Sequence, residues 1–143
     1  ALKMTQDCRT PLDNFREAVR AGGESVQKLQ AFFHTPEARA EALRQLGETY
    51  PQLILSSSLP GNLELNAPGA TKGDALLALC RALGLDPACA VAFGDGTNDM
   101  TMIRSAGIGV AMANAEPEVL AAADLIAPSN QEDGVAQVLS RWF

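Results

Sequence analysis

The second half of the chain alternates short apolar runs with helical patterns, and this alternation limits the possible folds more than any other feature. Apolar runs typical of strands lie at 88–93, 108–112 and 124–127. The first run is nearly continuous, as in a strand buried on both faces. Helices are predicted at 71–84, 98–106, 116–122 and 132–142. Strands and helices that alternate at these lengths predict βαβ units and a parallel sheet, so we expect an α/β fold here.

Residues 1–66 have a different pattern and predict a separate α+β unit. Helices are predicted at 11–20 and 35–47, and strands at 25–33, 53–57 and 62–66. The last two strands are expected to form a hairpin, because a turn-like Pro-Gly pair lies between them. The segment Ala67-Pro68-Gly69-Ala70 is typical of a hinge. We therefore expect two domains, at 1–66 and 67–143.

The charge balance and hydropathy of the chain exclude two classes of partner. Its 143 residues carry 11 Lys and Arg against 17 Asp and Glu, a net charge of −6 with no basic cluster. We therefore expect no nucleic-acid partner. No segment approaches the ~20 apolar residues of a membrane span, and the first residues lack a signal pattern, so no membrane association is expected.

Cysteine usage points to a reduced compartment. The three cysteines, Cys8, Cys80 and Cys89, show no Cys-x-x-Cys spacing, and the chain has 1 His, which is too few ligands for a Cys/His zinc site. We expect a cytoplasmic protein, with Cys80 and Cys89 as buried, inert thiols.

The sharpest motif is Gly94-Asp95-Gly96-Thr97-Asn98-Asp99, where an apolar strand is predicted to end and a helix to begin. Two carboxylates four residues apart, with an amide between them, can present oxygen atoms to one point at the carboxyl edge of the sheet. Oxygen ligands suit Mg²⁺, which commonly shares its protein site with a phosphate. The motif therefore suggests a phosphate bridged to the protein by a metal.

Other interpretations of this loop fit its residues less well. A dinucleotide fingerprint needs glycine where Asp99 stands, and a calcium loop needs glycine where Met100 stands. A Walker A sequence is absent. The remaining alternative is a capped turn, in which Asp95 and Asn98 only satisfy backbone donors.

Lys72 is a second candidate, at the start of the helix predicted after the hinge. A positive charge at a helix N-terminus opposes the helix dipole. A phosphate clamp explains such an ammonium group, and the alternative is an ordinary solvated lysine.

From about residue 26 to the end, the chain resembles the Cof-type branch of the haloacid dehalogenase (HAD) superfamily, which comprises Mg²⁺-dependent phosphohydrolases. Five segments in family order carry the resemblance: Leu63-Glu64-Leu65-Asn66, Ala70-Thr71-Lys72-Gly73-Asp74-Ala75-Leu76, Gly94 to Met100, Val110-Ala111-Met112-Ala113-Asn114-Ala115, and Asp124 with Glu132-Asp133-Gly134-Val135. The resemblance implies a HAD-like, partial Rossmann-type parallel sheet with an α+β cap segment before it.

The resemblance also implies roles for individual residues. Lys72 matches the catalytic lysine that holds the phosphoryl group, and Asp95 matches the catalytic acid that binds Mg²⁺. Asp99 matches the second acid of that metal motif. Asn98 matches an amide that contacts phosphate, and Asn114 matches an asparagine near the mouth of the site. The implied substrate is a small phosphorylated metabolite such as a sugar phosphate.

The chain departs from the family at the nucleophile. The family's Asp-x-Asp motif does not occur in this sequence, and neither does the Ser/Thr motif that should precede the cap; Ser56-Ser57-Ser58 lies in the cap-like region and is not assigned that role. We therefore expect a fragment, half of a split phosphatase, or a module that only binds phosphate or metal. Without the family's first core strand, the strand ending at Phe93 has an open, apolar edge. Self-association through that edge, or pairing with a missing N-terminal half, is expected.

Overall fold

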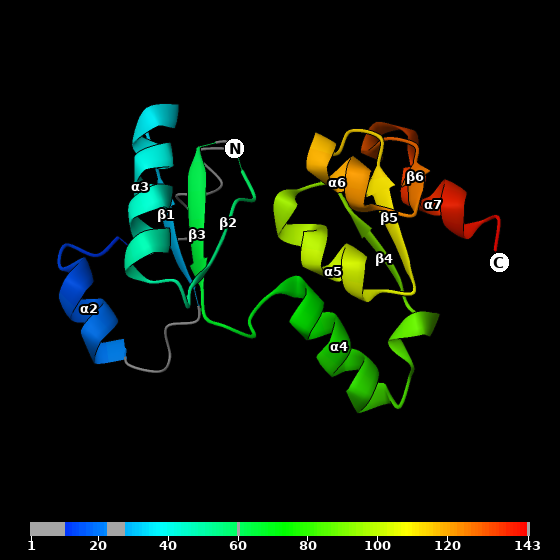
Figure 1. The fold of residues 1–143 in the computed structure, drawn as a ribbon, viewed down its shortest axis with the longest axis horizontal. Helices are drawn as coiled ribbons and strands as arrows, with labels where there is room; N and C mark the ends of the chain where they lie inside the picture. Colours follow the sequence, from blue (N-terminus) through cyan, green and yellow to red (C-terminus); the bar gives the residue numbers. More distant parts are fainter. Residues whose placement is uncertain (1–10, 23–27, 60, 143) are drawn as a thin grey trace.

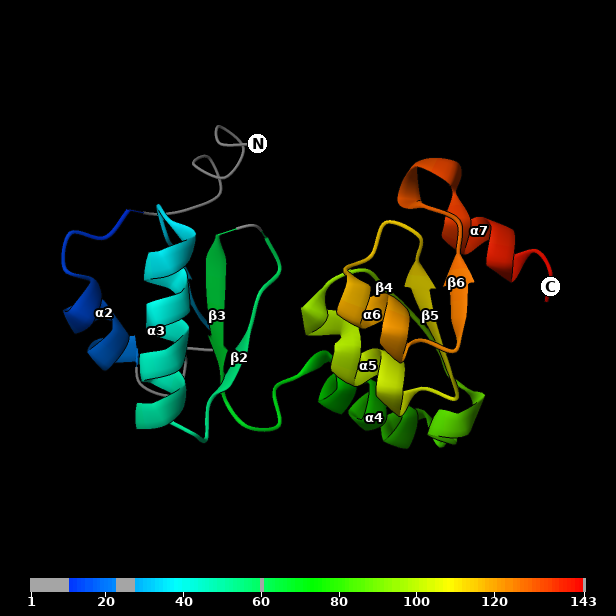
Figure 2. The same ribbon diagram turned by 45° about the horizontal axis from the view of Figure 1, so that its top comes forward.

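The computed structural model describes residues 11–22, 28–59 and 61–142, which form two units, each built on a three-stranded sheet (Figure 1). Cys8 and residues 25–27 of a predicted strand lie outside the described residues. A turned view separates the two sheets clearly, with the chain crossing once from β3 to α4 (Figure 2). The chain crosses between the units at residues 67–71, which include the predicted hinge segment Ala67-Pro68-Gly69-Ala70.

The first unit has an antiparallel sheet with β3 in its centre. Its elements are α2 (Phe15–Gly22), β1 (Leu29–Phe32), α3 (Pro36–Thr49), β2 (Ile54–Ser56) and β3 (Asn62–Asn66). β2 and β3 form the predicted hairpin. The predicted helix at 35–47 is also confirmed, with Thr35 as its N-cap and Pro36 in its first turn.

Asn62 fixes the turn of this hairpin. The side chain is fully buried. Its Oδ1 accepts hydrogen bonds from the Ser57 hydroxyl at 2.9 Å and from the backbone N–H groups of Ser58 and Leu59, both at 3.1 Å. A buried amide that closes a turn in this way satisfies backbone donors that would otherwise be left without partners. The turn therefore holds β2 against β3 in one register.

The second unit has a wholly parallel sheet in the order β4-β5-β6, which confirms the predicted α/β fold. Its elements are α4 (Lys72–Leu83), β4 (Val91–Gly94), α5 (Met100–Ser105), β5 (Ile108–Met112), α6 (Pro117–Ala122), β6 (Leu125–Ala127) and α7 (Gly134–Leu139). Its buried residues form two clusters: Val110, Met112, Ala127 and Val138, and separately Ile103, Ala111 and Val119. Helices cover the sheet on both sides, as the strand pattern requires.

Helix α4 forms where local signals place it. Thr71 and Asp74 make a capping box at its start, in which each side chain bonds the other residue's backbone N–H. Gly84 ends the helix with a φ of 67°, a left-handed conformation that favours glycine. These two signals fix Lys72 as the first helical residue.

Three expectations for this unit are wrong: the start of the strand at 88–93, its burial on both faces and the burial of Cys89. Residues 88–90 are not part of the strand, because Pro87–Cys89 forms a 3₁₀ turn whose Ala88 N–H bonds the Asp86 side chain. β4 is therefore shorter than predicted, and its burial alternates along the strand. Ala92 and Gly94 are buried, but Val91 and Phe93 on the other face are only half-buried, so β4 is not buried on both faces as predicted. Cys89 is correspondingly exposed, whereas Cys80 is buried as expected.

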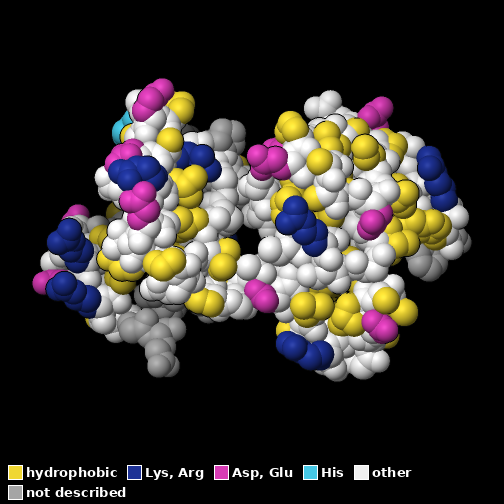
Figure 3. Space-filling model, viewed as in Figure 1, with side chains coloured by type: hydrophobic (Ala, Val, Ile, Leu, Met, Phe, Trp, Pro, Cys, Tyr) yellow, Lys and Arg dark blue, Asp and Glu magenta, His cyan; other side chains and the backbone are white. Residues whose placement is uncertain are grey.

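The predicted final helix is also shorter. Asp133 has a φ of 55° and separates a 3₁₀ turn at Asn130–Glu132 from α7. Leu79 and Leu83 of α4 are exposed, and so is Leu85 just after it. In Figure 3, hydrophobic side chains gather at the surface in the region of α4. Among the helices of the described residues, none combines the length and apolar character needed to cross a membrane.

Candidate functional site

Asp99 organises the loop at the carboxyl end of β4. It is only 5% exposed. Its Oδ2 accepts hydrogen bonds from the backbone N–H of Asp95 at 3.0 Å and of Gly96 at 3.2 Å. Its Oδ1 forms an ion pair with Nζ of Lys72. Both oxygens of this carboxylate are thus used within the protein, and the loop takes its shape from them.

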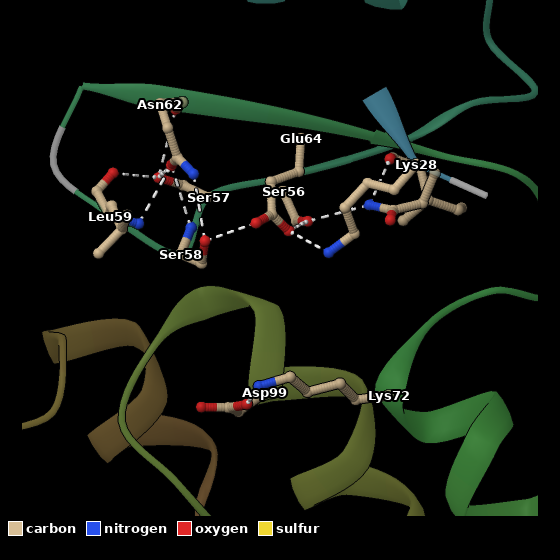
Figure 4. A network of polar contacts seen from close by, with 11 residues as sticks. Lys28, Ser56, Ser57, Ser58, Leu59, Asn62, Glu64, Lys72 and Asp99 are labelled. Carbon is tan, nitrogen blue, oxygen red and sulfur yellow. Dashed lines mark hydrogen bonds and ion pairs between the residues drawn. The ribbon is translucent and has the colours of Figure 1, made fainter. Parts of the chain in front are cut away.

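Lys72 joins this loop to α4. Its ammonium group lies against Asp99 (Figure 4), with which it forms an ion pair. Half of the Lys72 side chain remains exposed. The N-terminus of α4 can approach α5 because the next residue is glycine: the N–H of Gly73 donates to Thr101 Oγ1 at 3.1 Å. A Cβ on residue 73 would lie 2.6 Å from the Thr101 carbonyl oxygen. The close helix contact therefore positions the Lys72 ammonium at the end of the parallel sheet.

Asp95 and Asn114 form a second pair at the same edge of the sheet. Asp95 is exposed, and its Oδ2 accepts a long hydrogen bond from Asn114 Nδ2, at 3.4 Å. Asn114 is oriented from its other side, because its Oδ1 accepts the backbone N–H of Asn130 at 2.9 Å. The Asp95 carboxylate therefore keeps most of its hydrogen-bonding capacity for a ligand.

A cavity of about 150 Å³ lies between the two units. Lys72, Thr97, Asn98 and Thr101 are among its walls from the second unit, and Lys28, Ser56, Glu64 and Asn66 face them from the first. Lys72 and Asn98 therefore share the cavity, with Asp99 directly behind Lys72. Asp95 and Asn114 lie outside the cavity lining, linked to it through the bond from the Asp95 N–H to Asp99.

Sequence reasoning missed the polar wall contributed by the first unit. Glu64 is 5% exposed and accepts hydrogen bonds from Ser58 Oγ at 2.5 Å and from Lys28 Nζ at 2.9 Å. Figure 4 shows these side chains pointing from the hairpin toward Lys72 and Asp99. Burial acts to raise the pKa of Glu64, but the bonds from Ser58 and Lys28 outweigh it and hold that pKa below its ordinary value.

The signal for this wall was present in the sequence. Polar and apolar residues alternate strictly in Asn62-Leu63-Glu64-Leu65-Asn66, so the three polar side chains share one face of β3. Recognising that this face is turned toward Lys72 required the arrangement of the two units.

One of the two carboxylates at the sheet edge is well suited to bind Mg²⁺. Mg²⁺ is commonly held by one or two carboxylates together with phosphate oxygens and water. Asp95 offers such a carboxylate, whereas the charge of Asp99 is already matched by the Lys72 ammonium group and two backbone N–H groups. Within the described ranges, no three His, Cys, Asp or Glu side chains group together as a complete metal site. Direct binding of a metal by Asp99 stays a prediction.

Comparisons with known proteins identify the family of the chain. Residues 2–139 match the haloacid dehalogenase-like hydrolase family. The 5-amino-6-(5-phospho-D-ribitylamino)uracil phosphatase of Bacillus subtilis is 41% identical over 106 residues, which are 74% of this chain and 42% of that protein. A phosphoglycolate phosphatase of Methanoculleus marisnigri is 40% identical over 81 residues, 57% of this chain and 35% of that protein.

A solved structure gives the same result for the fold. A haloacid dehalogenase-like hydrolase from B. subtilis superimposes with a TM-score of 0.76 and 34% identity, covering 82% of this chain and 41% of that one. The chain thus spans less than half the length of these relatives. Because the family model matches nearly the whole sequence and the fold agrees with it, the chain belongs to the haloacid dehalogenase-like hydrolases.

Proposed function

We propose that this chain is part of a phosphatase that hydrolyses a small phosphorylated metabolite. The observation that carries the proposal is the position of Lys72, which is held by Asp99 at a cavity between a parallel sheet and a cap-like unit. An ammonium group on one wall of a small polar cavity suits a phosphoryl group. The relatives named as phosphatases support the same reaction. A cytoplasmic location is part of the proposal and rests on the three cysteines without pairing motifs.

Each residue of the site has a defined task in this proposal. Lys72 binds the phosphoryl oxygens, and Asn98 donates its amide hydrogens to them. Asp99 is a positioning residue, because it fixes both the Lys72 ammonium and the backbone of Asp95 and Gly96. Asn114 orients the Asp95 carboxylate. The charge of the phosphoryl group is thereby matched by groups that need little rearrangement on binding.

Mg²⁺ is the proposed cofactor, and Asp95 is the residue that would hold it. When bound, the ion neutralises charge on the transferred phosphoryl group. Asp99 would support the ion indirectly, because its two oxygens already bond Lys72 and the loop backbone.

We propose further that the nucleophile comes from a segment outside these 143 residues, in the same longer chain or in a second chain. No Asp-x-Asp motif occurs in the sequence. One edge of β4 has no partner strand in the described part of the chain, and a parallel strand added there would have its carboxyl end at the edge of the sheet that carries Asp95. A phosphatase needs an in-line nucleophile, which the residues named above do not supply.

A second candidate is a module that binds phosphate or metal without turnover, and the missing Asp-x-Asp favours it. Incubation with Mg²⁺ and phenyl phosphate separates the two. Turnover by the protein carrying its upstream segment, abolished by Asp95→Ala, supports the phosphatase. Tight binding of inorganic phosphate without turnover in that longer protein would instead support the binding module.

A further inference from the structure

On the face of β3 that is turned toward the cavity, three polar or charged side chains are buried. Asn62, Glu64 and Asn66 lie on this face of β3 and are 0%, 5% and 7% exposed. Burying a polar or charged group costs folding free energy unless the group is hydrogen-bonded. A protein with apolar side chains at such positions is often as stable or more stable. Asn62 is explained by the turn that it closes. Glu64 bonds Ser56 and Ser58 across the hairpin, but hydroxyl partners of this kind do not require a charged side chain.

Glu64 is held in place by three neighbours, Lys28 before β1 and Ser56 and Ser58 at the end of β2. Its Oε1 accepts from Ser58, and its Oε2 accepts from Lys28 and, at 3.5 Å, from Ser56. Ser56 is oriented in turn by Asn66, whose Nδ2 donates to its hydroxyl at 3.2 Å. A carboxylate can accept about four hydrogen bonds, and the contact from Ser56 is at the limit of length. Glu64 therefore retains capacity to accept a hydrogen bond from a ligand in the cavity.

The charges around the cavity cancel in two pairs. Lys28 pairs with Glu64 on one wall, and Lys72 pairs with Asp99 on the other. A phosphoryl group bound at Lys72 adds negative charge to this balanced set. A second anionic group on the same ligand would meet the Glu64 carboxylate, while Lys28 is already neutralised by it. A neutral hydroxyl group there could donate to Glu64 and accept from Lys28.

We propose that Glu64, with Lys28, is a specificity-determining pair that selects a neutral, hydroxyl-bearing leaving group and rejects one with a second anionic group. The proposal rests on the function proposed above, because it assumes that Lys72 binds the phosphoryl end of the substrate. Glu64 then contacts the other end of the substrate, across the cavity from Lys72. Recognition of this kind combines an attractive contact to one ligand with repulsion of its competitor.

Binding of three probes in the presence of Mg²⁺, measured by calorimetry on the full chain, tests the proposal. The probes are sorbitol phosphate, phosphoglycolate and inorganic phosphate. The wild type should bind sorbitol phosphate at least about tenfold more tightly than phosphoglycolate. Glu64→Gln, which keeps the size of the side chain, should weaken sorbitol phosphate about threefold to tenfold and strengthen phosphoglycolate by a similar factor. Inorganic phosphate should change less than about twofold.

Lys28→Met provides the opposite perturbation. Lys28 is half exposed, so replacing its side chain leaves no cavity in the packed interior. It leaves the Glu64 charge without its partner, and phosphoglycolate should therefore bind more weakly than to the wild type. Glu41→Gln is the matched control, because Glu41 is exposed on α3 and pairs with Arg44 away from the cavity. A purely structural role for the pair would move both variants in the same direction.

The outcomes separate this inference from the proposed function. If inorganic phosphate binds the wild type and Lys72→Met abolishes that binding, the phosphate site is supported. Unchanged selectivity in both Glu64→Gln and Lys28→Met would then overturn the inference alone. If inorganic phosphate does not bind, or binds equally well to Lys72→Met, the proposed function and the inference fail together.

Discussion

The side chain of Asp99 packs directly against the backbone of Gly94. A Cβ on residue 94 would lie 2.9 Å from Asp99 Cγ and 3.0 Å from its Oδ2, the oxygen that bonds the loop. Since Asp99 is buried and also pairs with Lys72, it has little room to move. The absence of a side chain at Gly94 is therefore what allows the loop after β4 to close over its own carboxylate.

Gly94→Ala should destabilise the second unit because the added methyl group overlaps Asp99. We expect a loss of about 1–3 kcal/mol in the free energy of unfolding, measured by urea denaturation. Gly47→Ala is the matched control: residue 47 lies within α3 and a Cβ there meets nothing within 4 Å. That change should leave stability unaltered or raise it by about 0.5–1 kcal/mol. Equal effects at the two glycines would refute the packing argument.

Lys72→Met should affect both stability and binding. It leaves the buried Asp99 carboxylate without its cation, which should cost about 1–2 kcal/mol of unfolding free energy, a modest value because Lys72 is half exposed. The affinity for inorganic phosphate should fall at least about tenfold. Arg81→Met removes the same charge from the other end of α4 and should leave phosphate binding unchanged. Retention of full phosphate affinity by Lys72→Met would contradict the assigned role.

Asp95→Asn should abolish the tightening of phosphate binding by Mg²⁺ and should leave the stability of the fold unchanged. Asp95 is exposed and makes one long side-chain hydrogen bond, so the unfolding free energy should change by less than about 0.5 kcal/mol. Calorimetric titration of inorganic phosphate should show tighter binding with Mg²⁺ in the wild type and no such gain in the variant. Asp13→Asn, at an exposed position remote from the sheet edge, is the control and should retain the gain.

The pH dependence of stability should reveal the Glu64 network. The pKa of Glu64 is lowered below its ordinary value of 4.5, so its stabilising contribution is complete above that pH and is lost as the pH falls through the lowered pKa. The difference in unfolding free energy between wild type and Glu64→Gln should therefore be largest near neutral pH and shrink in acid. The pKa values of Asp74 and Glu132 are also lowered, but both proteins share them. A difference that does not vary with pH would argue against this role.

The free edge of β4 should pair with another strand. We expect the 143-residue chain to self-associate in light scattering as its concentration rises. Val91→Lys, at that edge, should weaken the association because it introduces a charge into the paired strand; since Val91 also packs against the core, urea denaturation of the variant must show that it still folds. Leu125→Lys, on the opposite edge strand β6, should not. A monomer at every concentration would count against pairing through β4.

Local signals were sufficient to predict much of the second unit. Helix α4 lies between Thr71 and Gly84 because a capping box and a left-handed glycine act within a few residues of the backbone that they fix. The strand at 108–112 was predicted with its observed bounds. The strand at 88–93 was predicted too long because its apolar composition hides the turn that Pro87 and Asp86 make.

Some features of the candidate site could also be predicted from local signals, and others could not. The sequence by itself determined that Lys72, Asp95, Asn98 and Asp99 lie at helix starts and strand ends, because caps, glycines and apolar runs are short-range features. Only the tertiary structure showed that the Asp99 carboxylate pairs with Lys72 and accepts hydrogen bonds from the loop backbone. Asp95 is therefore the carboxylate that is available to a metal ion. It alone turned the polar face of β3 toward that site and brought Glu64 opposite Lys72. Hydrogen bonds and cavities between distant segments depend on how whole units pack, which no local pattern in the chain encodes.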